Sequence, residues 1–271
     1  MARAENPSLH PALRIFSAGV IIVLLVGAGL FFTPALVRPR WPWDVAPFNA
    51  RFLGSFYTAE IAVMLFLLVW NRWSPGRLIL FMAFTFTLVV TATSLVHHGM
   101  FNFARKAPWI WYAVYILSVI VSGYVLFASR SKPVVHGPRL APSLLTWLNL
   151  EWMLLALYGA ALLALPLQST AFWPWHIDIF HAQTYSAIFL SGAAGVWLLA
   201  RNGTREDFLV VATAEIMVGA LAILGLVLTD LAVHRVTWAA PGTIAWIALF
   251  ALIAASGIQK LLHARRMATI A

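Results

Sequence analysis

The chain has 271 residues, of which 62% are hydrophobic and 10% are charged, so it has too few polar side chains to cover a water-soluble globule of this size. Its formal charge of +9 does not indicate a nucleic-acid partner, because most Lys and Arg residues lie in short connections between apolar runs, a pattern that orients a chain in a bilayer. The absence of cysteine excludes disulfides, thiolate metal ligands and thiol nucleophiles.

Eight apolar runs are long enough to cross a bilayer, since about 20 apolar residues span a hydrocarbon core about 30 Å thick. The predicted fold is therefore an all-α polytopic membrane protein with eight transmembrane helices. The first run could instead be a cleaved signal, but its length and the lack of a small-x-small cleavage site favour a mature helix. The runs cover about 14–36, 51–70, 78–99, 108–128, 144–167, 182–200, 208–230 and 241–261.

The distribution of positive charge predicts how these helices are oriented. If the N-terminus is inside, 12 of the 18 Lys and Arg residues lie on the cytoplasmic side and six lie outside. This bias follows the positive-inside rule. We therefore expect a bacterial plasma-membrane protein with both termini cytoplasmic and lipid as its surroundings.

One tripeptide occurs twice in the chain. Trp41-Pro42-Trp43 recurs as Trp173-Pro174-Trp175, 132 residues later. Each copy follows one apolar run and precedes three, which predicts two parallel four-helix repeats, 1–130 and 144–271, joined by a cytoplasmic linker at 131–143. The alternative is chance recurrence, because the chain has 13 tryptophans and aromatic residues are common at membrane interfaces.

The role predicted for both tripeptides is structural. Proline fixes the direction of the chain, and flanking indoles can anchor a turn at the depth of the lipid headgroups. We therefore predict that the motif sets where the next helix enters the membrane. The predicted interfacial anchors are Trp41, Trp43, Trp173 and Trp175.

The first tripeptide, followed by Pro47 and by Ala50-Arg51, resembles a pattern in uncharacterised multi-pass bacterial membrane proteins. The resemblance covers about residues 30–70 and, more weakly, 170–200. The second copy departs from the pattern with Ile179 and Gln183 where the first has Pro47 and Arg51. The resemblance implies a shared membrane architecture and no particular activity.

Histidines and aspartates gather at the predicted outer face. They could bind a transition metal or haem, or relay protons, so the cofactor is left open. Helical spacing argues against a metal, because only Asp230 and His234, at i and i+4, share a face. The alternative is a set of hydrated interfacial polar residues. The candidate metal set is His97, His98, His176, Asp178, His181, Asp230 and His234.

Two acids, Glu60 and Glu215, lie about eight to ten residues inside apolar runs. An ionised side chain at that depth costs several kcal/mol unless it is paired, neutral or facing water. The sequence offers no Lys or Arg in the middle of a run as a partner. Two interpretations remain open: the acids couple proton movement to transport, or they are neutral and hydrogen-bond one helix to another. Small residues such as Gly219 are predicted to be helix-packing seams.

Two function classes follow, with enzymatic activity left open. The preferred hypothesis is a small carrier of a small molecule or ion, with its site between the repeats and with Glu60 and Glu215 as proton-coupling or substrate residues. The alternative is a membrane redox enzyme or accessory subunit that uses the outer histidines and aspartates for metal, haem or quinone. A plain accessory packing subunit is a third option.

Overall fold

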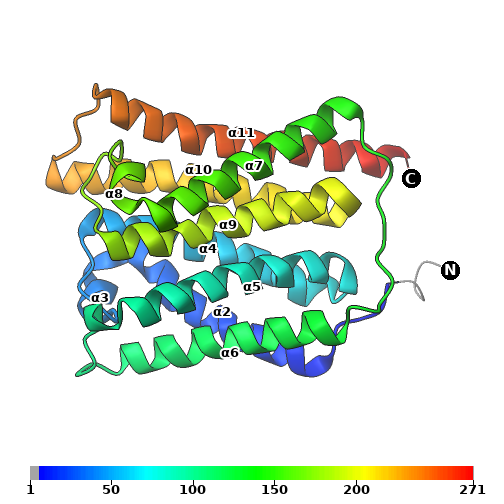
Figure 1. Ribbon diagram of the computed structural model, residues 1–271, viewed down its shortest axis with the longest axis horizontal. Helices are drawn as coiled ribbons and strands as arrows, with labels where there is room; N and C mark the ends of the chain where they lie inside the picture. Colours follow the sequence, from blue (N-terminus) through cyan, green and yellow to red (C-terminus); the bar gives the residue numbers. More distant parts are fainter. Residues whose placement is uncertain (1–5, 271) are drawn as a thin grey trace.

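The computed structural model describes residues 6–270, and every regular element in that range is a helix. Eight long helices lie side by side along one common direction (Figure 1). Each of the eight predicted runs coincides with one of them. The long helices are α2 (Pro11–Phe32), α4 (Pro47–Trp70), α5 (Trp73–Val96), α6 (Ala107–Ala128), α7 (Pro142–Ala164), α9 (Ile179–Asn202), α10 (Arg205–Val233) and α11 (Pro241–Ile270). Four single turns join them: α3 (Pro34–Val37), η1 (Arg38–Arg40), η2 (His98–Met100) and α8 (Pro166–Ser169).

Proline marks the start of several of these helices. α2, α4, α7 and α11 begin at Pro11, Pro47, Pro142 and Pro241, where the missing N–H costs nothing and the fixed φ angle suits a helix. Helix α4 therefore begins four residues before the predicted run, because hydropathy alone does not register a proline start. α10 begins instead with a capping box between Thr204 and the residue three positions later, which satisfies free N–H groups of the first turn.

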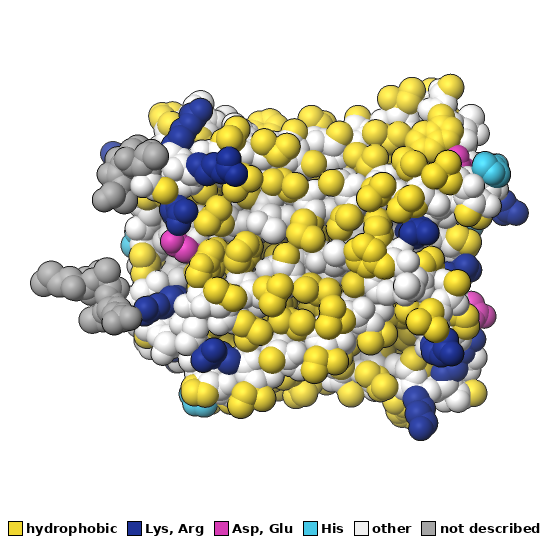
Figure 2. Space-filling model, turned by 180° about the vertical axis from the view of Figure 1, so that it is seen from behind, with side chains coloured by type: hydrophobic (Ala, Val, Ile, Leu, Met, Phe, Trp, Pro, Cys, Tyr) yellow, Lys and Arg dark blue, Asp and Glu magenta, His cyan; other side chains and the backbone are white. Residues whose placement is uncertain are grey.

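Seven of the long helices in the described chain, all except α9, are long and apolar enough to cross a membrane. Figure 2 shows a broad apolar band over the middle of one face of the molecule, with Lys and Arg side chains gathered toward its two ends. This distribution suits a hydrocarbon layer between two wet interfaces. The chain is therefore an integral membrane protein with several membrane-crossing helices.

Helix α9 is less apolar because most of it faces protein. It packs between α5 and α7, and its polar residues Thr184, Ser186 and Ser191 are buried. Polar side chains are common on the interior faces of membrane helices, where they can hydrogen-bond to neighbouring helices. At 24 residues, α9 is nevertheless as long as its neighbours.

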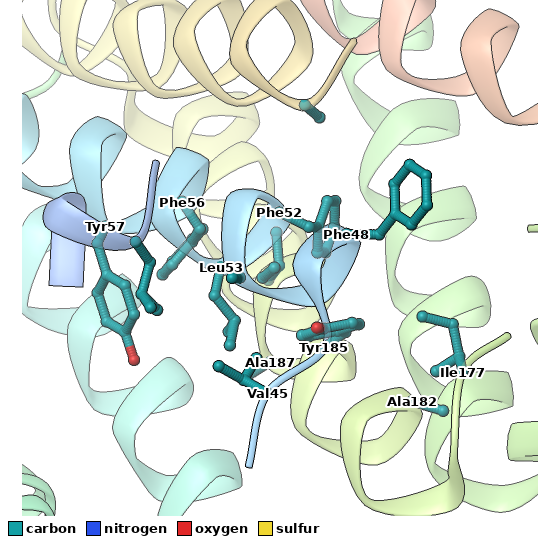
Figure 3. Packing of buried hydrophobic residues seen from close by; sticks show 14 of the residues in the cluster. Val45, Phe48, Phe52, Leu53, Phe56, Tyr57, Ile177, Ala182, Tyr185 and Ala187 are labelled. Carbon is teal, nitrogen blue, oxygen red and sulfur yellow. The ribbon is translucent and has the colours of Figure 1, made fainter. Parts of the chain in front are cut away.

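The helices form two groups along the chain, which we call the N-terminal group, α2 to α6, and the C-terminal group, α7 to α11. Within the groups α2 packs on α4, α5 on α6, α7 on α9 and α10 on α11. Between the groups α4 packs on α10 and α5 packs on α9. Figure 3 shows part of this interface, where Phe52 of α4 lies against Tyr185 of α9, with ring centroids 4.8 Å apart.

Equivalent elements of the two groups begin at a nearly constant spacing. Three pairs start 132 residues apart: α3 and α8 at Pro34 and Pro166, α4 and α9 at Pro47 and Ile179, and α5 and α10 at Trp73 and Arg205. The start of α2 and the end of α11 lie at one end of the bundle, and α3 and α8 lie at the other (Figure 1). The chain therefore begins and ends its helical part on the same side.

Glycines allow α10 and α11 to approach closely. A Cβ atom on Gly257 would lie 2.8 Å from the carbonyl oxygen of Ala212, and one on Gly219 would overlap the carbonyl oxygen of Phe250. The predicted packing seam at Gly219 is confirmed. Backbone atoms cannot move aside as a flexible side chain can, so a larger residue must push the two helices apart.

Gly257→Leu is therefore expected to lower the free energy of unfolding by about 2–3 kcal/mol. The matched control is Gly19→Leu in α2, because a Cβ on Gly19 meets no atom within 4 Å. Thermal unfolding of both variants in detergent, followed by tryptophan fluorescence, checks the difference. Equal midpoints for the two variants would show that the close approach of α10 and α11 does not limit stability.

Candidate functional site

The four predicted anchor tryptophans lie inside the protein. Trp41, Trp43 and Trp173 are 6%, 1% and 6% exposed, and Trp175 is half-buried. The rings of Trp43 and Trp111 have centroids 4.8 Å apart, and those of Trp175 and Trp246 are 5.3 Å apart. The structure thus differs from the prediction that these indoles anchor the turn among lipid headgroups: they pack against other aromatic rings near the end of the bundle that holds α3 and α8.

The second indole of each tripeptide bonds across the interface between the groups. Trp43 Nε1 donates to His181 Nε2 of α9 at 3.0 Å, and Trp175 Nε1 donates to Asn49 Oδ1 of α4 at 2.7 Å. Both partners occupy the third position of their helices, and they are 132 residues apart. The contact is therefore reciprocal.

A second pair of hydrogen bonds follows the same spacing. Arg51 Nη1 donates to the carbonyl of Phe31 at 2.5 Å, and Gln183 Nε2 donates to the carbonyl of Leu163 at 2.8 Å. Gln183 is one of the two residues at which the second copy departs from the sequence pattern of the first. Despite that change, it makes the hydrogen bond that the pattern's arginine makes, because both side chains place an N–H donor at the end of the preceding helix.

His181 is held in one tautomer by its neighbours. An indole N–H can only donate, so Nε2 of His181 accepts the bond from Trp43. Nδ1 then carries the proton and donates to Asp178 Oδ2 at 2.6 Å, while the backbone N–H of His181 donates to Asp178 Oδ1 at 2.8 Å. Partial burial alone would raise the pKa of Asp178, but these hydrogen bonds outweigh it and hold that pKa below its usual range.

Asp178→Asn is expected to destabilise the protein by about 1 kcal/mol at neutral pH, since the helix cap persists but Nδ1 of His181 loses its acceptor. The Asp178 side chain is 42% exposed, so water screens part of the effect. Because the pKa of Asp178 is lowered by folding, its stabilising effect is present above the usual aspartate range and is lost as pH falls through the lowered value. The unfolding midpoints of the parent protein and of Asp178→Asn should converge as the pH is lowered from 7 to 3. A constant difference between the two midpoints would contradict this account.

The other predicted metal ligands are dispersed. His97 Nε2 bonds Gln183 Oε1 at 2.6 Å, His98, His176 and His234 are exposed, and Asp230 accepts from the backbone N–H groups of two residues beyond the end of α10 and from an indole. Among residues 6–270, no three His, Asp or Glu side chains gather in a way that could hold a metal ion. Hence the structure does not assemble the candidate set into one site.

A buried ion cluster joins three helices of the C-terminal group. Lys260 of α11 donates to Glu151 Oε2 of α7 at 2.6 Å, to Glu215 Oε2 of α10 at 2.7 Å and to Ser256 Oγ at 2.8 Å. Lys260 is 0% exposed, and the two glutamates are 8% and 7% exposed. The expectation that no cation would pair with Glu215 was therefore wrong.

The cluster lies well inside the bundle. Glu151 and Glu215 come nine and ten residues after the starts of α7 and α10, and Lys260 lies ten residues before the end of α11, so all three lie about 15 Å from the same end. Two carboxyl groups share one ammonium, and the cluster is electrically neutral only when one carboxyl carries a proton. Glu215 Oε1 is buried without a hydrogen-bond partner in the described chain and is a place where that proton can reside.

Glu60 lies in a different environment. It is half-buried, and no hydrogen bond or ion pair joins it to another residue of the described chain. It lines a cavity of about 850 Å³ walled by α2, α4, α5 and α6, in which it is the only acid among the described lining residues. The cavity is otherwise mostly apolar, so Glu60 has no local counter-charge.

Both acids also line one smaller cavity. A space of about 50 Å³ lies between the two groups, and its wall includes Glu60 of α4 and Glu215 of α10. Apart from these two acids and Ser191, the residues that line this space are apolar. The structure therefore brings together the two acids that the sequence singled out, although they are 155 positions apart (60 and 215).

Sequence reasoning missed Lys260 because the last run was expected to end at residue 261. Lysine at a helix end is common and is normally exposed, but α11 continues to Ile270. The usable signal was shared depth: Glu151, Glu215 and Lys260 lie at similar distances from helix ends on one side of the bundle.

No family model, no curated protein and no solved structure matches this chain.

Proposed function

We propose that this integral membrane protein is a small carrier driven by proton transfer, with its transport site between the N-terminal and C-terminal groups. The observation that carries the proposal is that Glu60 and Glu215 line the same cavity at the boundary between the groups. Transport sites of many carriers lie near the midplane between two structural halves. Acids inside a membrane are also costly unless they have a function or a partner.

The ion cluster supplies the element that responds to the proton. With one proton on Glu215, the cluster is neutral and Lys260 holds α7, α10 and α11 together. Loss of that proton leaves one net negative charge in an apolar interior, which costs several kcal/mol. Gain or loss of a proton at Glu215, which borders the small cavity, therefore changes the free energy of the contact between these helices.

We further propose that the two groups are repeats and that all eight long helices cross the plasma membrane of a bacterium, with both chain ends cytoplasmic. The constant spacing of 132 residues and the reciprocal bonds of Trp43 and Trp175 support the repeats. The start of α2 and the end of α11 lie at the same end of the bundle (Figure 1), which supports an even number of crossings. Because Lys260 is buried inside the bundle, it is not counted among the cytoplasmic charges. Eleven Lys and Arg residues then lie on the cytoplasmic side and six lie outside.

The two groups differ at the positions of the ion cluster. At the repeat spacing of 132 residues, Glu215 corresponds to Ala83 and Glu151 corresponds to Gly19. Ala83 lines the large cavity. The ion cluster thus fills, in the C-terminal group, the region that is open in the N-terminal group. A carrier whose repeats exchange these arrangements would open its site alternately.

The absence of cysteine permits a direct test of proton-linked exchange. A single cysteine introduced by Ala83→Cys reports access to the large cavity through its rate of reaction with N-ethylmaleimide in proteoliposomes. Ser131→Cys, on the exposed linker, corrects for the effect of pH on the thiol itself. We expect the corrected rate at position 83 to change at least fivefold between pH 5.5 and pH 8.

The acids are tested in the same assay. Glu60→Gln and Glu215→Gln, each added to Ala83→Cys, should make the corrected rate independent of pH. Glu206→Gln is the matched control, because Glu206 is 40% exposed and pairs only loosely with Arg205 at 3.8 Å. Unchanged pH dependence in both acid variants would remove Glu60 and Glu215 from the mechanism. A rate independent of pH in the parent protein would remove proton coupling altogether.

A further inference from the structure

The large cavity of the N-terminal group also points to a class of ligand. We infer that it binds a lipophilic organic cation, meaning an apolar molecule with one positive charge, that enters from the lipid and pairs with Glu60. The inference rests on the proposed carrier function in taking this ligand as the cargo. The binding site itself stands on the size, lining and charge of the cavity.

Size and lining suit an apolar molecule. A volume of about 850 Å³ falls within the roughly 300–1,000 Å³ of cavities that hold drug-sized ligands. The wall is mainly aliphatic and aromatic, with side chains such as Leu24, Ile79 and Phe86. Such a wall offers burial of apolar surface and few hydrogen bonds, so a strongly polar solute would lose its hydration without compensation.

The charge of the cavity selects a cation. Glu60 has no counter-charge nearby, and a positive group placed beside it would restore neutrality in a medium where unpaired charge is costly. Arg40 also lines the cavity, but its guanidinium donates to the carbonyl of Leu36 at 2.7 Å. Arg40 precedes α4, whereas Glu60 lies 13 residues after the start of that helix, about 20 Å farther along its axis.

Aromatic rings next to Glu60 strengthen this choice. Tyr57 lies three residues before Glu60 on the same face of α4, and its hydroxyl bonds that of Tyr115 at 3.0 Å. The rings of Tyr115 and Trp111, 4.3 Å apart, also line the cavity. Aromatic faces attract organic cations, so the wall combines a carboxyl group with the ring chemistry that recognises such ligands.

The route of entry follows from exposure. Ile22 and Leu25 of α2 and Ile110 of α6 line the cavity, yet they are 67%, 56% and 56% exposed. These side chains therefore border both the cavity and the lipid-facing surface of the bundle. A ligand dissolved in the acyl-chain layer can reach Glu60 from the side without first crossing the aqueous phase.

Equilibrium binding of tetraphenylphosphonium to the purified full chain in detergent tests the inference. Tetraphenylborate has the same shape and the opposite charge, so it is the matched probe. We expect the cation to bind at least tenfold more tightly than the anion. Equal binding of the two ions, or tighter binding of the anion, would overturn the inference without the need for any variant.

Two variants locate the site. Glu60→Gln should weaken tetraphenylphosphonium binding by about 30-fold or more, as expected when one partner of a desolvated charge pair is lost, while Glu206→Gln should leave it unchanged. Ala83→Leu should weaken binding by filling the cavity, whereas Ala160→Leu, on an exposed position of α7, should not. Unchanged binding in both Glu60→Gln and Ala83→Leu would place the cation elsewhere and overturn the inference.

The proton-driven carrier function and the cation-binding site can be disproved independently of each other. Loss of cation selectivity with intact pH-dependent labelling at position 83 would leave a proton-driven carrier with another cargo. Selective binding that needs Glu60, together with labelling that does not respond to pH, would leave a cation-binding membrane protein that is not a proton-driven carrier.

Discussion

Lys260→Met is expected to lower the free energy of unfolding by about 3–5 kcal/mol, the usual cost of removing one partner from a buried ion pair. The variant removes the only positive charge that contacts Glu151 and Glu215 in the described chain. Both carboxyl groups then stay buried without a cation, and the bonds that join α11 to α7 and α10 at this point are lost. Unfolding in mixed micelles with increasing dodecyl sulfate measures the change.

Two further variants make the Lys260 result specific. Lys106→Met removes an exposed lysine and should shift stability by less than about 0.5 kcal/mol. Adding Glu151→Gln and Glu215→Gln to Lys260→Met removes the stranded charges and should restore part of the stability, since a neutral buried cluster is less costly than unpaired carboxylates. A loss of stability no larger than that of Lys106→Met would refute a structural role for the cluster.

Trp43→Ala is expected to cost about 3–5 kcal/mol, as for other large aromatic residues deleted from a core. Trp43 is 1% exposed, and its ring centroid lies 4.8 Å from that of Trp111 and 5.0 Å from that of Phe180. The substitution leaves a cavity at the interface between the two helix groups. It also leaves Nε2 of His181 buried without its donor.

Trp43→Phe separates the two contributions. It keeps most of the ring packing and removes the N–H, so we expect a loss of about 1–2 kcal/mol, the cost of an unsatisfied buried acceptor. Trp109→Ala is the control for a tryptophan at the lipid surface, since Trp109 is 64% exposed. If Trp43→Ala and Trp109→Ala proved equally stable, the indole of Trp43 would be an interfacial anchor, as the sequence alone predicted.

Hydropathy determined the class of protein and the approximate position of every long helix, although it missed the proline start of α4 and the last nine residues of α11. Hydropathy is a local property: an apolar stretch of about 20 residues must form its backbone hydrogen bonds internally. The two tripeptides also gave the offset of 132 residues that the helix starts and the bonds of Trp43 and Trp175 follow. The sequence likewise singled out Glu60 and Glu215 as deep acids, because hydropathy registers a charged residue within an apolar run.

Tertiary structure alone decided which of these residues meet. Lys260 bonds Glu151, 109 residues away, and Glu215, 45 residues away, and no periodicity in the sequence encodes contacts of that range. The tryptophans expected at the lipid interface are buried because the two helix groups close over them, and the histidines expected together are separated by the same packing. Helix contacts depend on shape and close approach over the whole bundle, whereas hydropathy reports only whether each segment can leave water.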